Sequence, residues 1–183
     1  MKYASEDLIN EHKGILFGLR ILQKIVKTVE QPGEADIKDI NDIIDFLRLF
    51  ADKCHHGKEE GLMFPALEEA GIPNEGGPIG QMLKEHIQGR QCIAEMAASV
   101  GSRALQADRF TEAATNYIDL LREHIQKENT VLFPMGDRIL PFDKQRQLLE
   151  QFEAFEEEVM GKGTHERLHE TLHKLGEKYL NTK

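Results

Sequence analysis

Apolar residues recur at spacings of three and four along most of the chain, and this period predicts amphipathic helices. Ser5 and Asp36 are expected helix N-caps. Short connections make successive helices antiparallel neighbours, so the pattern predicts an up-down-up-down four-helix bundle. We expect its helices to run from Ser5 to the Gln31-Pro32-Gly33 turn, from Asp36 past Phe64-Pro65 to a loop at Gly71 to Pro78, from Ile79 to Val100 before a break near Gly101-Ser102, and from Asp108 to Pro134 or Gly136.

Two more helices are expected after this core. Pro141 starts a fifth element, in which Phe152 can pack on the bundle, and Gly161-Lys162-Gly163 separates it from a last helix that begins at Thr164. The predicted fold is therefore all-α. We expect one domain over residues 1–183, with a four-helix core at 5–136 and a C-terminal helical extension at 141–181.

Composition and charge narrow the class of protein. A chain of 183 residues with no tryptophan and six prolines has the composition of a helical protein. Its net charge of -9 argues against a nucleic-acid partner, because phosphate contacts need a basic surface. No apolar run is long enough to cross a bilayer and no signal-peptide pattern is present. We therefore expect a cytoplasmic protein without a membrane partner, in which Cys54 and Cys92 remain reduced.

Each of the four core helices carries a histidine within its apolar stripe. His12 and His86 lie shortly after the start of upward helices. His55 and His124 lie at matching positions before a Phe-Pro pair, near the end of downward helices. At about 1.5 Å rise per residue, all four histidines are expected in one layer of the bundle.

Two of these histidines begin a repeated motif. Residues 55–65 (HHGKEEGLMFP) return at 124–134 (HIQKENTVLFP), which pairs Glu59 with Glu128. Each copy holds a His and a Glu four residues apart, and on an α-helix this spacing places both side chains on one face. The spacing is typical of a pair of metal ligands.

Burial of these six residues together favours a metal centre over separate structural roles. A satisfied core histidine or a surface His-Glu contact explains any one of them, but together they leave two carboxylates in an apolar core. Two divalent cations compensate that charge, and six nitrogen and oxygen ligands suit two iron ions better than one tetrahedral zinc. The ferritin-like pattern of Glu-x-x-His on two helices fits less well. A purely structural helical module is the rival hypothesis.

The motifs form a specific combination: Glu11-His12, His55-x-x-x-Glu59-Glu60 with Leu62-Met63-Phe64-Pro65, Glu85-His86, and His124-x-x-x-Glu128 with Leu132-Phe133-Pro134. By these motifs the sequence resembles the hemerythrin-like family, the HHE cation-binding domain, over roughly residues 5 to 136. The resemblance implies a four-helix bundle with a non-haem di-iron centre of two Fe ions. It also implies that Glu59 and Glu128 are bridging carboxylates and that the terminal ligands are His12, His55, His86 and His124.

Two positions depart from the oxygen-carrying members of that family. Those proteins have a fifth His one turn after the third-helix His, where this chain has Arg90. Their fourth-helix carboxylate is an Asp five residues after its His, where this chain has Glu128 four residues after His124. Both departures resemble the bacterial branch, which is similar to the di-iron domain of proteins that repair iron centres after nitric oxide or oxidative stress. The expected partner is a small ligand, namely dioxygen, nitric oxide or peroxide, and the expected role is that of an oxidoreductase, a sensor or an iron-handling module.

Several other side chains have two interpretations. Arg90 either brings a positive charge near a bound ligand or pairs with a surface carboxylate such as Glu85 or Glu11. His56 is rotated by about 100° from the stripe that holds His55, so it is expected at the surface or behind the ligands. The last helix carries a row at spacings of four that forms either a second metal site or ordinary side chains beside a packing stripe: His165, His169 and His173.

Overall fold

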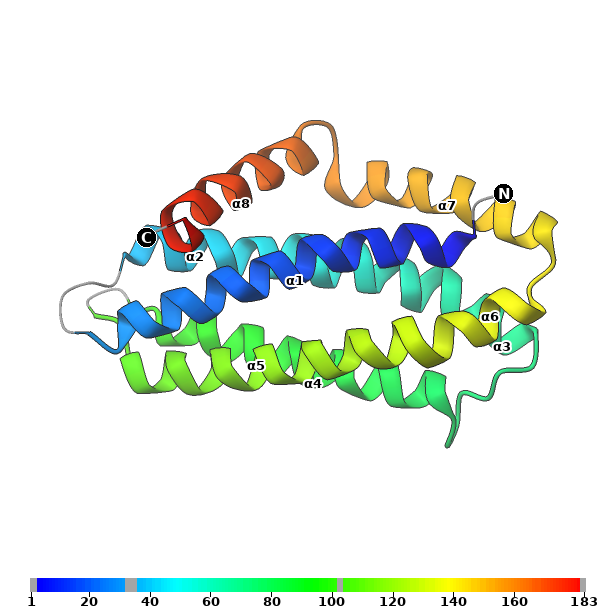
Figure 1. Ribbon diagram of the computed structural model, residues 1–183, viewed down its shortest axis with the longest axis horizontal. Coiled ribbons are helices and arrows are strands. Elements are labelled where there is room, and N and C mark those ends of the chain that lie inside the picture. The colour runs from blue at the N-terminus through cyan, green and yellow to red at the C-terminus, as the bar shows by residue number, and fades with distance from the viewer. Residues whose placement is uncertain (1–2, 32–35, 102–103, 182–183) are drawn as a thin grey trace.

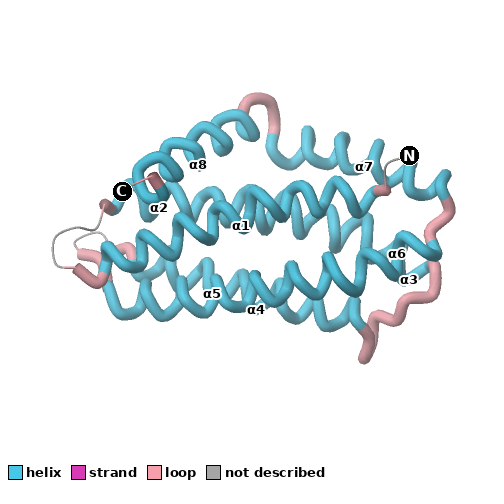
Figure 2. Tube along the Cα trace, viewed as in Figure 1, coloured by secondary structure: helices cyan, strands magenta, loops and turns pink. Residues whose placement is uncertain are grey.

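The computed structural model describes residues 3–31, 36–101 and 104–181, and the all-α fold class that the sequence predicts is confirmed (Figure 1). Figure 2 shows helices along nearly the whole described chain, joined by short loops. The first core helix is α1 (Ala4–Val29), and the second is α2 (Ile37–Phe46) continued by η1 (Leu47–His56), η2 (Glu59–Met63) and α3 (Phe64–Glu69). The third is α4 (Pro78–Ser99), and the fourth is α5 (Ala107–Lys127) continued by η3 (Glu128–Leu132) and α6 (Phe133–Ile139). The C-terminal helices are α7 (Phe142–Met160) and α8 (Thr164–Leu180).

Three of these segments, η1, η2 and η3, are π-helical. A π-helix hydrogen-bonds each residue to the fifth one along and so has more residues per turn than an α-helix. Two of the predicted helices therefore change their winding within their length. The π-helical segments lie in the two helices that carry the repeated His-x-x-x-Glu motif.

One of the two predicted N-caps is confirmed and the other is wrong. The carboxylate of Asp36 accepts hydrogen bonds from the first backbone N–H groups of α2, as predicted. Ser5 lies inside α1, whose first N–H group, at Ala4, donates to Gln145 Oε1 at 2.9 Å instead. The Ser5 hydroxyl donates to Asp137, so it joins α1 to α6. The predicted turn and break residues Pro32, Gly33 and Ser102 lie outside the described residues.

The fourth core helix does not end at Pro134 or Gly136 but continues to Ile139. In an α-helix a proline ring collides with the carbonyl four residues earlier and removes a hydrogen bond. Here η3 places a wider turn immediately before Pro134, which then occupies the first turn of α6, where a missing N–H is tolerated. The second core helix passes Pro65 in the same way, through η2 into α3.

The apolar core is divided into two clusters by the histidine layer. Along α1, Leu8 belongs to one cluster and Ile15 to the other, with His12 between them. The other three core helices repeat this order around their own histidines: Met82 and Ile93 flank His86, Cys54 and Met63 flank His55, and Leu121 and Leu132 flank His124. A buried polar layer thus crosses a bundle that is apolar above and below it.

The two C-terminal helices cover the side of the bundle formed by α1 and α2, away from α4 and α5 (Figure 1). Helix α8 contacts α1 and α2, while α7 contacts α1, η1 and η2. Phe152 of α7 is 1% exposed, as predicted. Gly57 allows this close approach, because a Cβ there would lie 2.8 Å from Phe155 Cζ. The predicted break between α7 and α8 is confirmed at residues 161–163.

No described helix combines the length and the apolarity that a membrane crossing requires. Cys54 is buried, Cys92 is half-buried, and both are free thiols, as predicted.

Candidate metal centre

The four histidines of the predicted layer meet in the interior of the bundle. Each of their side chains is 1% exposed. The ring centroids of His12 and His55 are 4.6 Å apart, those of His86 and His124 are 4.8 Å apart, and the Nε2 atoms of the latter pair lie 3.2 Å from each other. Four helices therefore direct one imidazole each into the same layer, as the heights in the sequence predict.

Glu59 and Glu128 lie within this layer and are fully buried. Oxygens of Glu59 lie 3.4 Å from His55 Nε2 and 3.4 Å from His86 Nε2. An oxygen of Glu128 lies 3.3 Å from His12 Nε2 and 3.2 Å from His124 Nε2. Each carboxylate thus faces one imidazole of its own helix and one of a neighbouring helix.

The winding of the helices places these carboxylates. Glu59 is the first residue of η2 and Glu128 is the first residue of η3. Single turns of π-helix are frequent at functional sites, because the wider turn changes the direction of the side chains around it. The two copies of the repeated motif therefore share their backbone geometry as well as their sequence.

An outer ring of polar groups orients the four imidazoles. Each imidazole Nδ1 contacts one side-chain oxygen, which leaves Nε2 directed at the centre. The pairs are His55 with Glu11 at 2.8 Å, His124 with Glu85 at 2.9 Å, His86 with Glu60 at 2.7 Å, and His12 with Asn129 at 2.8 Å.

This outer ring repeats the pseudo-symmetry of the sequence. Each of Glu11 and Glu85 immediately precedes a layer histidine, contacts the histidine of the following helix, and accepts a hydrogen bond from a lysine ammonium. The lysines are Lys58, whose Nζ lies 2.5 Å from Glu11, and Lys127, which donates to Glu85. Glu60 and Asn129 likewise each follow a buried carboxylate in the repeat. The sequence contained this signal, because the repeat aligns these positions, but their roles depend on which helices face each other.

The layer fits a metal because several of its inward-facing atoms make no hydrogen bond. Within the described residues, hydrogen-bond partners are lacking for Nε2 of His12 and His55 and for both oxygens of Glu59 and Glu128. Buried polar groups are nearly always hydrogen-bonded, and buried carboxylates are paired or bind metals. The nitrogen and oxygen donors present are those that iron and similar divalent ions accept.

The facing nitrogens of His86 and His124 support the same conclusion. Both Nδ1 atoms donate to carboxylates, so in neutral imidazoles both Nε2 atoms carry a lone pair. Two lone pairs directed at each other across 3.2 Å repel. Either a proton or a metal cation at this position removes the repulsion.

Protons and cations compete for this site. Burial alone would lower the pKa of His124, but the carboxylates of Glu128 and Glu85 outweigh it and raise the pKa to about 10. Burial would raise the pKa of Glu85, but hydrogen bonds from His124, Gln81 and Lys127 lower it to about 2. A metal that binds to His124 must therefore displace a proton, and the neighbouring carboxylates make that proton hard to remove.

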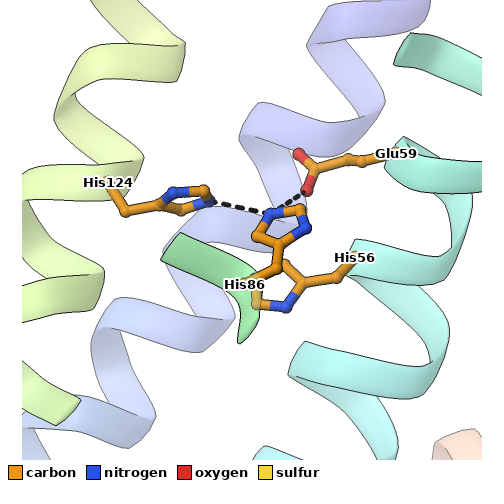
Figure 3. A group of neighbouring side chains, drawn as sticks. All are labelled: His56, Glu59, His86 and His124. Carbon is orange, nitrogen blue, oxygen red and sulfur yellow. Dashed lines mark hydrogen bonds and ion pairs between the residues drawn. The ribbon is translucent and has the colours of Figure 1, made fainter. Parts of the chain in front are cut away.

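Of the two positions expected for His56, at the surface or behind the ligands, the surface position is wrong. Its side chain is 2% exposed, and its ring stacks on that of His86 with centroids 3.9 Å apart and an angle of 15° (Figure 3). The prediction assumed the angular step of an α-helix, whereas His56 is the last residue of π-helical η1, where the step between successive side chains is smaller. His55 and His56 can therefore both face the interior.

Arg90 pairs with carboxylates other than the two that the sequence suggested. Its guanidinium donates to Asp52 and to Glu60, at 2.7 Å in each case, and its side chain is 39% exposed. Glu60 also holds His86. Arg90 thus contacts the outer ring of polar groups through Glu60, on the side of His86 that faces away from the centre.

The histidines of α8 lie away from the layer. His165 and His173 are exposed and approach Glu156 and Glu177 at 3.6 and 3.7 Å, and His169 is also exposed. None of the three belongs to a group of potential metal ligands in the described part of the chain.

A further group of potential ligands, Glu11, Cys54 and Glu156, surrounds a lysine. The fully buried ammonium of Lys58 lies 2.5 Å from Glu11 and 3.7 Å from Glu156, so a cation of the chain itself already occupies the centre of this group. Burial raises the pKa of the Cys54 thiol to about 12. The thiol is therefore neutral and a poor metal ligand.

Comparisons with known proteins agree with this geometry. The sequence model of the Hemerythrin HHE cation binding domain matches residues 4–136, which include all six predicted ligands. An uncharacterized protein of Mycobacterium bovis and two of Mycobacterium tuberculosis are each 26% identical to the chain over 163 residues, or 86% of this chain. The chain spans 63% of the length of these curated relatives. No solved structure matches the chain significantly.

Proposed function

Since the chain belongs to the hemerythrin HHE cation-binding family, we propose that it is a non-haem di-iron protein whose centre binds or reacts with dioxygen, nitric oxide or peroxide. Membership of the family indicates cation binding, typically of iron, and the buried His/Glu layer fits such a site. The number of metal ions and the reaction with a small ligand are the parts that we propose.

One observation carries the proposal of two metals. The potential ligand atoms fall into two groups of four, and within each group all atoms lie within 4.8 Å of one another. One group is His12, His55, Glu59 and Glu128, and the other is His56, Glu59, His86 and His124. Because Glu59 belongs to both groups, two adjacent metal positions share a carboxylate.

The side chains of the layer supply charge and orientation. Glu59 and Glu128 offset part of the charge of two divalent ions, and the outer ring holds each imidazole with Nε2 inward. A pair of iron ions bound by these residues would supply electron transfer and would bind the small ligand. The apolar clusters on both sides keep bulk water from the layer, which strengthens every electrostatic interaction within it.

The size of the site favours a small ligand. Each layer residue is 2% exposed or less, and the surface hollows of the described residues are lined by other parts of the chain. A metabolite of ordinary size does not fit such a buried layer, whereas a diatomic molecule or peroxide does. Three functions are consistent with a site that admits only small ligands. The protein consumes the ligand, senses it, or handles iron.

The test is to reduce the iron-loaded protein and add dioxygen, nitric oxide or hydrogen peroxide separately, following the visible spectrum and the amount of ligand consumed. Multiple turnovers would identify an oxidoreductase. A reversible spectral change without turnover would identify a binding or sensing protein. The absence of a spectral response to all three molecules would reject the proposed reactivity and leave iron handling or a structural metal.

A further inference from the structure

His12 and His86 occupy corresponding places in the two halves of the centre, and their inner surroundings nearly match. Both side chains are 1% exposed. The Nε2 atom of His12 lies 3.3 Å from Glu128, and that of His86 lies 3.4 Å from Glu59. Each ring also stacks on the phenylalanine of a Phe-Pro pair, with centroids 5.8 and 5.7 Å apart. On this side the ring of His56, which lies against His86, is the main difference.

The outer sides of these two rings differ in chemistry. His86 Nδ1 contacts a carboxylate oxygen of Glu60 at 2.7 Å, whereas His12 Nδ1 contacts the amide oxygen of Asn129 at 2.8 Å. Glu60 and Asn129 hold the same position in the repeated motif, one residue after the buried glutamate. The distances are nearly equal, so one imidazole has a charged acceptor exactly where the other has a neutral one.

The cation that accompanies the carboxylate is exchanged as well. Arg90 donates to Glu60 at 2.7 Å and lies four residues after His86. The residue four positions after His12 is Leu16, which packs against an apolar cluster. The two other carboxylates of the outer ring each accept a hydrogen bond from a lysine. Three of the four imidazoles therefore have a carboxylate backed by a cation, and the fourth has an amide.

The acceptor at Nδ1 affects how strongly an imidazole binds a metal through Nε2. A carboxylate acceptor makes the imidazole more basic, and mutation of such an outer partner typically costs about 10- to 100-fold in metal affinity. A neutral amide accepts the same hydrogen bond more weakly, because hydrogen bonds to an ionised group are roughly twice as strong as neutral ones. His12 is therefore the weakest donor among the four imidazoles.

We propose that Asn129 is a positioning residue that, through His12, makes one of the two metal positions weaker than the other. The weaker position is that of His12 and His55. Its second imidazole, of His55, has a carboxylate partner as His124 does, so the amide at His12 makes the difference. This inference rests on the proposed di-iron function. One ion then stays while the other exchanges, which lets the chain take up and release iron without emptying the centre.

The test is a pair of exchanges that keep the shape of the side chain. Asn129→Asp gives His12 a carboxylate partner, and Glu60→Gln removes the one of His86. Iron(II) binding is measured anaerobically by competition with a chelator, and proton release is recorded so that competition by protons is subtracted. We expect Asn129→Asp to tighten the weaker of the two binding steps by roughly tenfold, and Glu60→Gln to weaken the tighter step by a similar factor.

The control is Gln126→Glu, which adds the same charge at an exposed position and should change neither step. A merely structural role of Asn129 does not produce the expected result, because damage to the fold does not tighten a site. A weaker step that is unchanged or weakened in Asn129→Asp would overturn the proposal. Fewer than two ions in wild type would instead contradict the proposed function.

A measurement on the unaltered chain covers the case in which the variants fail to fold. Wild-type protein with ¹⁵N-labelled histidine receives one equivalent of zinc(II), and the imidazole signals are followed by NMR. Signals of His86 and His124 should move to their metal-bound positions while those of His12 and His55 stay at their metal-free positions. Equal partial occupation of both positions, or the reverse order of filling, would overturn the proposal.

Discussion

Glu59 and Glu128 are fully buried carboxylates that face imidazole nitrogens at 3.2–3.4 Å, yet their oxygens lack hydrogen-bond partners among the described residues. Burial of a carboxylate charge is costly unless the charge is compensated, and a bound cation compensates it more fully than imidazoles at these distances do. Their contribution to stability should therefore depend on whether metal is present.

Replacement of Glu59 or Glu128 by alanine should remove the stabilisation that metal provides. A metal held at about 100 times its Kd stabilises the folded state by about 2.7 kcal/mol. We expect each variant to lose most of this increment, measured as the difference in thermal unfolding with and without iron(II). Full iron content in the double variant would rule out these residues as ligands.

Metal loading should release protons and weaken at low pH. Carboxylates raise the pKa of His124 to about 10, so this imidazole is protonated at neutral pH in the metal-free protein, and carboxylates also raise the pKa values of His55 and His86. A metal ligand must be deprotonated. We expect protons to be released when iron(II) is added in weak buffer, and the affinity to fall as the pH is lowered.

The same shifts predict how the metal-free protein responds to alkali. A histidine whose pKa is raised by folding stabilises the fold fully below its unfolded value of about 6.5. That contribution is lost as the pH rises through the folded value, which for His124 is about 10. Glu128→Gln should reduce both the proton release and this alkaline loss, and an unchanged proton release in that variant would contradict the assignment.

At the scale of elements, the periodicity of the sequence predicted the helices well and their winding poorly. The apolar stripes located the core helices, and the repeated His-x-x-x-Glu motif located Glu59 and Glu128. Both signals depend only on the spacing of residues along the sequence. The π-helical segments could not be predicted, since a stripe tolerates a change of winding over one or two turns. For this reason the burial of His56 was left open and the end at Ile139 was missed. The roles of Glu11 and Glu85 depend on contacts between helices, which one sequence does not contain.

The C-terminal helix α8 is attached to α2 by a small polar cluster. The Tyr179 hydroxyl donates to Asp39 at 2.7 Å, and Lys178 Nζ contacts Asp39 at 2.5 Å and Asp36 at 2.8 Å. Burial and the hydrogen bond to Asp39 raise the pKa of Tyr179, and the hydrogen bonds that Lys178 donates to Asp36 and Asp39 raise the pKa of Lys178. Both shifts stabilise the fold fully below about pH 10 and lose that effect as the pH rises through the folded values.

Tyr179→Phe should therefore alter the stability of the protein in a pH-dependent way. We expect a loss of about 1 kcal/mol at neutral pH, the net value of one hydrogen bond, and a smaller further decline above pH 10 than in wild type. Denaturant midpoints measured between neutral and alkaline pH provide the test. Parallel pH profiles for the two proteins would show that Tyr179 does not attach α8 in this manner.

In the whole molecule, the core helices surround one polar layer between two apolar clusters. The C-terminal helices add residues to both clusters. Met160, Leu168 and Tyr179 pack in one cluster, while Leu148 and Phe152 pack in the other. Helix α7 also covers the buried Lys58, whose ammonium lies 5.5 Å from the centroid of the Phe152 ring. We therefore propose that the C-terminal extension and the four-helix core form one domain, and that α7 supports the outer ring of the metal centre.

The central claim is that this layer holds two iron ions between Glu59 and Glu128. The most direct measurement is an anomalous difference map at the iron absorption edge from crystals of iron-loaded protein. We expect two peaks within the histidine layer, roughly 3.5–4 Å apart, one beside His12 and His55 and the other beside His86 and His124. A single peak in the layer, or iron bound only elsewhere on the chain, would contradict it.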